Sequence, residues 1–177
     1  MTGGAVTSRT GHIARTPYFD PEAYAAAAGI VPAGRAAALA HYLARGVARG
    51  LAPHPLFHLP WYRSEHPGLG AGDPLVHYLA SDRRTRTPHP LLDPDWYRER
   101  YPDVARSRVD PVLHYWLHGG RERRDPGPAF PVARYLARHP DLDPAATNPL
   151  VHHLARYAQA AFHPLGAVTV LEHPGHA

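Results

Sequence analysis

Histidine is the residue type in this chain whose number and spacing could support chemistry, with 15 histidines in 177 residues. His114 and His118 lie four positions apart, so on a helix they would share a face and could ligate a metal ion together. Glu122 would lie one turn further along, although Gly119-Gly120 makes such a helix hard to continue. The segment also lacks the glutamate that acts as base in the zinc-protease helix motif. A histidine-dependent metal-binding protein, which could be hydrolytic, is therefore the alternative hypothesis.

Four histidines recur at equivalent places and favour a structural role. They are His41, His77, His114 and His152. Metal ligands converge on one ion at bond lengths of about 2 Å, whereas repeated positions in a stack point in parallel. Because buried polar groups generally find partners, we expect each histidine to bond a backbone carbonyl or a tyrosine hydroxyl of a neighbouring helix.

Other catalytic patterns are weak. Asp93-Pro94-Asp95 and Asp141-Leu142-Asp143 resemble the Asp-x-Asp signature of many glycosyltransferases, but both lie at predicted helix boundaries and are interpreted as caps. The glycine-rich stretch 68–72 precedes a helix, yet Asp73 would repel a phosphate there, so we interpret it as a connector. None of the four serines lies in Gly-x-Ser-x-Gly. We predict no catalytic residue and no cofactor, and we favour a protein that is not an enzyme.

The composition narrows the class of protein further. The chain has no cysteine, which excludes a disulfide scaffold and a thiolate zinc site. It has no run of about 18 apolar residues, so no membrane-spanning helix is predicted. The net charge is +4, but all 19 basic residues are arginine, which is typical of a G+C-rich genome. No nucleic-acid-reading motif accompanies the charge, so nucleic acid is not an expected partner.

An internal repeat organises the chain. Its first marker is Phe19, Phe57, Leu92 and Phe130, at separations of 38, 35 and 38 residues. A tyrosine follows five residues after each: Tyr24, Tyr62, Tyr97 and Tyr135. The recurring histidines form the second marker, 20 to 22 residues after the first. We predict four copies, at 18–55, 56–90, 91–128 and 129–165, with a mobile leader at 1–17 and an unassigned tail at 166–177 in which 167–171 could form a strand.

The prolines, 21 in all, indicate what each copy is. Proline is favoured at the first helical position, and Asp or Asn before it caps the free amides. Helix starts are predicted at Asp20-Pro21, Asp73-Pro74, Asp93-Pro94, Asp110-Pro111 and Asn148-Pro149, and helix ends before Pro67, Pro102 and Pro140. Phe19 and Tyr24 would form a hydrophobic staple around the first start. The prediction is an all-α fold of four tandem helix-turn-helix repeats, forming a small α-solenoid or compact helical array.

The third copy carries the fullest form of a known pattern. Leu92 to Pro128 contains Asp-Pro-x-x-Tyr, then Tyr101-Pro102-Asp103-Val104, Asp-Pro-x-x-His-Tyr and a Gly- and Arg-rich turn at 119–123. The pattern resembles the helical repeats beside glycosyltransferase domains in bacterial surface-polysaccharide proteins, and the resemblance covers about 19–165. It implies an accessory, non-catalytic module with a protein partner or linked glycosyltransferase domain. The expected location is the cytoplasm, with the inner face of the membrane as a more specific alternative. The first and fourth copies depart from it, with Ala36–Ala38 and Pro131-Val132 replacing Asp-Pro.

Arginines follow the second helix in two successive copies. They are Arg83, Arg84, Arg86, Arg121, Arg123 and Arg124. Stacking of the copies would gather them into a basic strip that could bind an anionic glycan or a sugar nucleotide. The simpler interpretation is favourable placement of cations near helix C-termini.

Overall fold

The computed structural model describes residues 15–81 and 86–157, which are helical and contain no strand. The elements are α2 (Pro21–Ala28), α3 (Arg35–His41), η1 (Tyr42–Gly46), α4 (Leu59–Glu65), η2 (Pro67–Leu69), α5 (Pro74–Ala80), α6 (Pro94–Arg100), α7 (Pro102–Ser107), α8 (Pro111–His114), η3 (Tyr115–Gly119), α9 (Val132–Arg138) and α10 (Pro149–Tyr157). None of these helices is long and apolar enough to cross a membrane. The all-α prediction is confirmed for the described residues, and the possible strand at 167–171 lies outside them.

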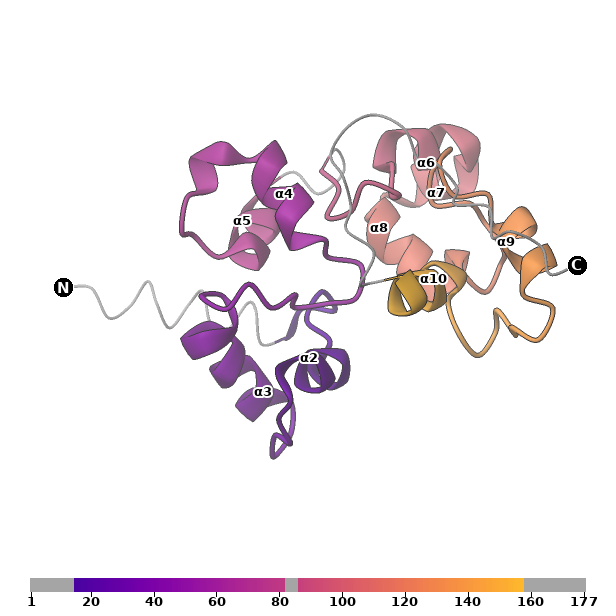
Figure 1. The fold of residues 1–177 in the computed structure, drawn as a ribbon. Coiled ribbons are helices and arrows are strands. Elements are labelled where there is room, and N and C mark those ends of the chain that lie inside the picture. Colours follow the sequence, from indigo (N-terminus) through magenta and orange to yellow (C-terminus); the bar gives the residue numbers. More distant parts are fainter. Residues whose placement is uncertain (1–14, 82–85, 158–177) are drawn as a thin grey trace, which may run out of the picture.

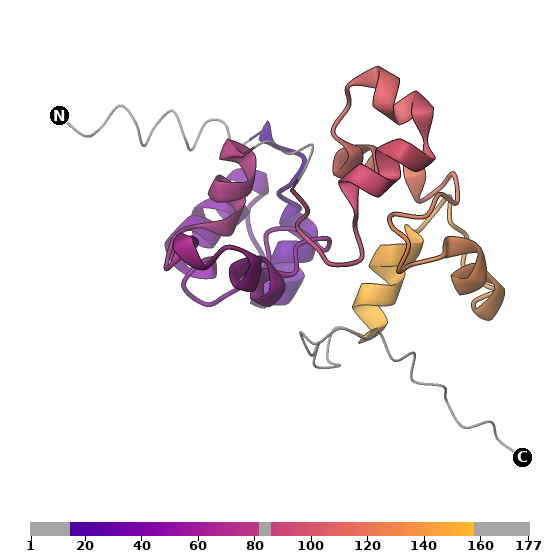
Figure 2. The ribbon, with the colours of Figure 1, turned by 90° about the horizontal axis from the view of Figure 1, so that it is seen from above.

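The helices divide into two halves. Helices α2 to α5 form one half and α6 to α10 the other (Figure 1), and the same division is visible from above (Figure 2). Buried side chains from both halves nevertheless belong to one hydrophobic cluster. His54, in the loop before α4, packs edge to face against Trp116 of η3 with ring centroids 4.3 Å apart. This aromatic contact ties the two halves together.

The helix starts follow the predicted capping chemistry. Four aspartates each accept hydrogen bonds from the first amides of a helix that begins with proline: Asp20, Asp73, Asp93 and Asp110. Helix α9 has no such residue, because Pro131 precedes it. Its first amide, from Val132, instead donates to Asp125 Oδ1 at 2.6 Å. The departure in the fourth copy is thus compensated by a carboxylate seven residues upstream.

The helix ends match the proline positions, with one addition. Helices α4, α6 and α9 each end two residues before a proline. The residue between the helix end and the proline leaves the helical conformation, because the proline ring disfavours it there. The expectation of two helices per copy does not hold for the third copy. Pro102 both terminates α6 and begins α7, because proline also suits the first position of a new helix.

The repeated aromatic residues form the core. Side chains of the first marker are all buried, and six tyrosines are at most 1% exposed: Tyr24, Tyr42, Tyr62, Tyr78, Tyr97 and Tyr115. The predicted staple is present, with the rings of Phe19 and Tyr24 centred 5.6 Å apart. A buried tyrosine hydroxyl requires a hydrogen-bond partner. For three of these tyrosines, the hydrogen-bond partner of the hydroxyl is a recurring histidine.

Candidate functional site

In each copy, the tyrosine five residues after the first marker is hydrogen-bonded to the recurring histidine of the same copy. The distances from Oη to Nδ1 are 2.7 Å for Tyr24–His41, 2.9 Å for Tyr62–His77, 3.1 Å for Tyr97–His114 and 2.8 Å for Tyr135–His152. The expectation that these histidines bond a tyrosine hydroxyl is confirmed. Each imidazole has one nitrogen engaged in the fold, which leaves only Nε2 for any other ligand.

Two glycines make room for these tyrosines. Gly46 and Gly119 end the π-helical turns η1 and η3. A Cβ on Gly46 would overlap the hydroxyl of Tyr24, and one on Gly119 would overlap that of Tyr97. π-turns often mark functional sites. Here the close approach of a buried hydroxyl gives a structural reason for glycine at the end of each turn.

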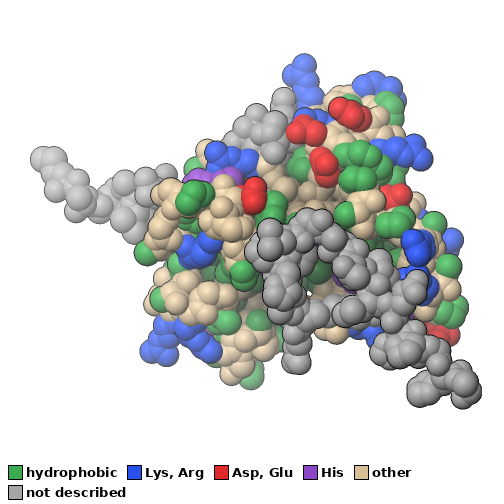
Figure 3. Space-filling view, turned by 45° about the horizontal axis from the view of Figure 1, so that its top comes forward, with side chains coloured by type: hydrophobic (Ala, Val, Ile, Leu, Met, Phe, Trp, Pro, Cys, Tyr) green, Lys and Arg blue, Asp and Glu red, His purple; other side chains and the backbone are tan. Residues whose placement is uncertain are grey.

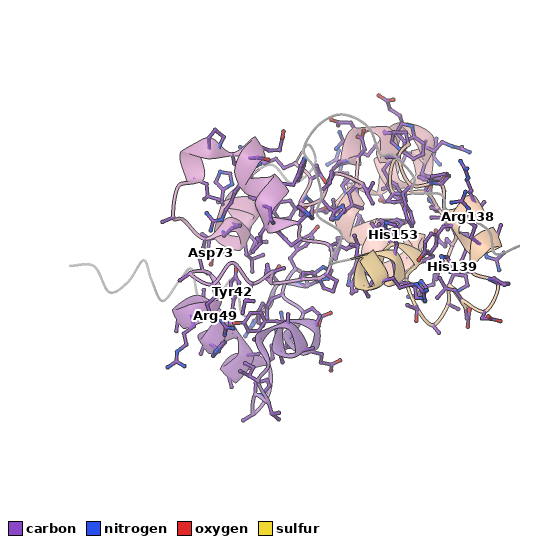
Figure 4. All side chains as sticks on the ribbon, viewed as in Figure 1. Tyr42, Arg49, Asp73, Arg138, His139 and His153 are labelled. Atoms are coloured by element: carbon purple, nitrogen blue, oxygen red, sulfur yellow. The ribbon has the colours of Figure 1, made fainter. Side chains whose placement is uncertain are left out.

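In the first and third copies, the tyrosine directly after the recurring histidine bonds the cap of a later helix. The Tyr42 hydroxyl donates to Asp73 Oδ1 at 2.8 Å (Figure 4), and the Tyr115 hydroxyl donates to Asn148 Oδ1 at 3.3 Å. Asp73 and Asn148 also accept the first amides of α5 and α10. Burial raises the pKa of Tyr42 and of Tyr115, so both hydroxyls remain protonated donors. One polar atom thus serves as helix cap and as a link between successive copies.

Two buried histidines hold turns. His54 Nδ1 accepts the Leu56 N–H at 3.1 Å, and His89 Nδ1 accepts the Leu91 N–H at 3.0 Å. Burial lowers the pKa of His54 to about 4 and that of His89 to about 3, so both rings are neutral at pH 7. Thr16, at the end of the predicted leader, is buried and plays the same part in the first copy. The shared X-Pro register of these three residues was a signal that sequence reasoning missed.

The predicted metal ligands are only partly brought together. The rings of His114 and His118 lie 5.4 Å apart between centroids, but His114 Nδ1 bonds Tyr97. Burial also lowers the pKa of His114. Glu122 Oε2 pairs instead with Arg124 Nε at 2.6 Å. Within residues 15–81 and 86–157, no three His, Cys, Asp or Glu side chains gather to hold a metal ion.

The predicted basic strip is divided among local contacts. Arg83 and Arg84 lie outside the described residues. Arg86 Nη1 lies 3.2 Å from His77 Nε2, and Arg121 Nη2 donates to the Leu117 carbonyl at 2.7 Å. Figure 3 shows the described basic side chains in separate groups on one face of the molecule.

The remaining two arginines of the strip differ from each other. Arg124 pairs with Asp103 at 2.8 Å and with Glu122, and its guanidinium lies 4.8 Å from the ring centroid of Tyr101. Arg123 is exposed and adopts a left-handed backbone, with φ of 58°. Arg121, which donates to the carbonyl of Leu117, thus matches the simpler interpretation of a cation near a helix C-terminus. The charge of Arg124 is offset by two carboxylates of the same chain.

Of the two Asp-x-Asp sequences, the first supplies a helix cap and the second holds a turn between α9 and α10. Asp93 accepts the Trp96 N–H at 2.9 Å, and Asp143 accepts the Ala145 N–H at 2.9 Å. Asp95 instead pairs with Arg98 on the same helix.

Two surface pockets lie among the described residues of the second half. One, of about 270 Å³, is lined by Trp116, Leu117, Arg121, Pro144, Ala145, Ala146 and Asn148. The other, of about 240 Å³, lies between α9 and α10 and is lined by Arg138, His139, Pro140, Asp141, Leu142, His152 and Arg156. Sequence reasoning missed the basic residues of this second pocket. The four-residue spacing of His152 and Arg156, which places them on one face of α10, was the available signal.

The chain matches no protein-family model, no curated protein and no solved structure.

Proposed function

We propose that this chain is a non-catalytic helical repeat module, in which four tandem copies pack into a small solenoid or compact array and present a surface for binding. The observation that carries the proposal is the set of four Tyr–His hydrogen bonds at equivalent positions. These bonds commit the recurring histidines, the most promising chemical groups in the sequence, to holding the helices of each copy together.

Equivalent backbone hydrogen bonds in the first three copies support the tandem arrangement. In each, the amide at the first helix cap donates to a proline carbonyl near the end of the same copy. These bonds are Asp20 N to Pro53 O at 2.9 Å, His58 N to Pro88 O at 2.9 Å and Asp93 N to Pro126 O at 3.0 Å. Helices this short are marginal in isolation. Contacts between copies add to these bonds, because Tyr42 and Tyr115 each bond the helix cap of the following copy, as expected of a repeat protein.

The partner is proposed from the resemblance and the charge. A linked or separate glycosyltransferase of surface-polysaccharide synthesis would be the protein partner, at the inner face of the membrane. An anionic glycan or sugar nucleotide would suit the net charge of +4.

The proposal predicts that the chain binds a polysaccharide and does not transfer or release sugar. The purified chain is incubated with nucleotide sugars and candidate acceptors, and binding of anionic and neutral bacterial polysaccharides is measured by calorimetry. We expect binding of a polysaccharide and no release or transfer of sugar. Sugar transfer by the chain alone would refute the proposal. Tight zinc binding that is lost in a His114→Ala, His118→Ala double variant would favour the metal-binding alternative.

A further inference from the structure

In the third copy, a side chain of the protein occupies the space beside the hydrogen-bonded pair Tyr97 and His114. Arg124 reaches over the ring of Tyr101 and pairs with Asp103 and Glu122. Two carboxylates thus surround one guanidinium, and the hydrogen bonds of that cation are made within the chain. Hydrogen bonding to Arg124 accordingly lowers the pKa of Asp103 to about 2.

Among the described residues, the equivalent place in the fourth copy has more positive than negative side chains. His139-Pro140-Asp141-Leu142 occupies the register of Tyr101-Pro102-Asp103-Val104, so Asp141 corresponds to Asp103. The pocket between α9 and α10 is lined by this one carboxylate and by two guanidinium groups, Arg138 and Arg156. Arg138 is the last residue of α9 and His139 follows it (both labelled in Figure 4).

Two imidazoles, those of His139 and His152, also line the pocket. The rings of His139 and His152 meet edge to face, with centroids 5.4 Å apart. Tyr135 engages His152 Nδ1, so the remaining ring nitrogen is the one free to meet a ligand. Burial lowers the pKa of His152, and the nearby His139 and Arg156 lower it further.

We propose that this pocket binds the phosphate or carboxylate group of a small, sugar-sized molecule, a ligand class that rests on and sharpens the proposed role as a binding module. Arginine pairs with planar or tetrahedral oxyanions through two parallel hydrogen bonds. Pro140 and Leu142 supply apolar surface beside the charged groups, and the Asp141 carboxylate can accept hydrogen bonds from the hydroxyl groups of a ligand. The volume of about 240 Å³ lies just below the roughly 300–1,000 Å³ of drug-sized sites, which favours a single sugar over a larger ligand.

The experiment titrates the full chain with four probes: inorganic phosphate, glucose 1-phosphate, glucuronate and neutral glucose. Binding is followed by calorimetry and by the imidazole ¹⁵N signals of His139 and His152. We expect at least one oxyanion probe to bind and to shift these two signals, and glucose not to do so. The phosphate and carboxylate probes distinguish the two sources of negative charge.

Matched variants separate a built site from net charge. Arg138→Gln with Arg156→Gln should weaken binding about tenfold or more, because hydrogen bonds between charged groups are lost. Arg106→Gln with Arg134→Gln removes the same charge from exposed positions outside the pocket and should change the affinity less than about twofold. Thermal unfolding confirms that each variant is folded.

Each result bears on a defined claim. Equal weakening in both double variants, or no binding of any oxyanion probe to the wild type, would overturn the pocket proposal and leave the module proposal intact. Binding of glucose 1-phosphate followed by its hydrolysis would support the pocket and overturn the non-catalytic function.

Discussion

Acid should destabilise this fold through His54 and His89. Both rings are about 2–3% exposed and accept a backbone N–H, so protonation would place a charge in the core and remove an acceptor. Their pKa values in the folded chain, about 4 and about 3, lie below the ordinary 6.5. Between the folded and the ordinary pKa values, the unfolded chain therefore binds more protons than the folded chain. The stabilising free energy contributed by the two neutral rings is present above pH 6.5 and is lost as the pH falls toward 4.

The size of the loss follows from the linkage relation. Between pH 7 and pH 5, a histidine whose pKa drops from 6.5 to about 4 on folding loses about 2 kcal/mol of stabilising free energy. His89 loses a similar amount over the same interval, because at pH 5 both folded pKa values lie well below the solution pH. The free energy of unfolding should thus fall by about 4 kcal/mol from these two groups together, a large share of the stability of an ordinary domain.

The chain itself offers the matched substitution. Thr16 accepts the Tyr18 N–H at 3.3 Å in the place that His54 and His89 occupy, and threonine does not titrate. Urea unfolding of the wild type and of a His54→Thr, His89→Thr double variant, monitored by tryptophan fluorescence, is compared at pH 7 and pH 5. The variant should be less stable at pH 7, because contacts such as that of His54 with Trp116 are lost, but its stability should change much less with pH.

A control variant isolates burial as the cause. His118 is exposed, so His118→Thr should keep the wild-type pH dependence. If the double variant retains the full loss between pH 7 and pH 5, the assignment to His54 and His89 is refuted.

Two further substitutions test the local devices of the fold. Gly119→Ala should cost about 1–3 kcal/mol, because the new Cβ overlaps the buried Tyr97 hydroxyl, whereas Gly68→Ala, with open space around it, should stay within about 0.5 kcal/mol in thermal unfolding. Equal effects of the two would contradict the close-approach argument. Asp125→Ala should cost about 0.5–2 kcal/mol by removing the cap of Val132, and Asp125→Asn, which keeps an acceptor oxygen, should cost less. Equal losses in the alanine and asparagine variants, measured by urea unfolding, would show that Asp125 does not act as a cap.

The predictable parts of the structure are those encoded locally. Asp20 before Pro21 specifies a helix start within a few residues, and Phe19 with Tyr24 specifies how the chain enters it. The Tyr–His bonds were foreseeable because the two markers recur together. The cap that Asp125 gives to α9 was not, because it depends on how a loop folds back rather than on neighbouring residues.

The candidate pocket escaped prediction for a related reason. A self-comparison of the sequence finds what the copies share, and in this chain the shared residues are the ones that hold each copy together. Asp103 and Asp141 occupy the same register, as do Arg100 and Arg138, but Arg124 pairs with Asp103, whereas Arg156, at the register of His118, lines the pocket around Asp141. Residues that bind a ligand are expected at positions that differ between the copies, because a position fixed in every copy by packing cannot also be varied to suit one ligand. In a repeat protein the search for a site should therefore begin where equivalent positions carry unequal charge.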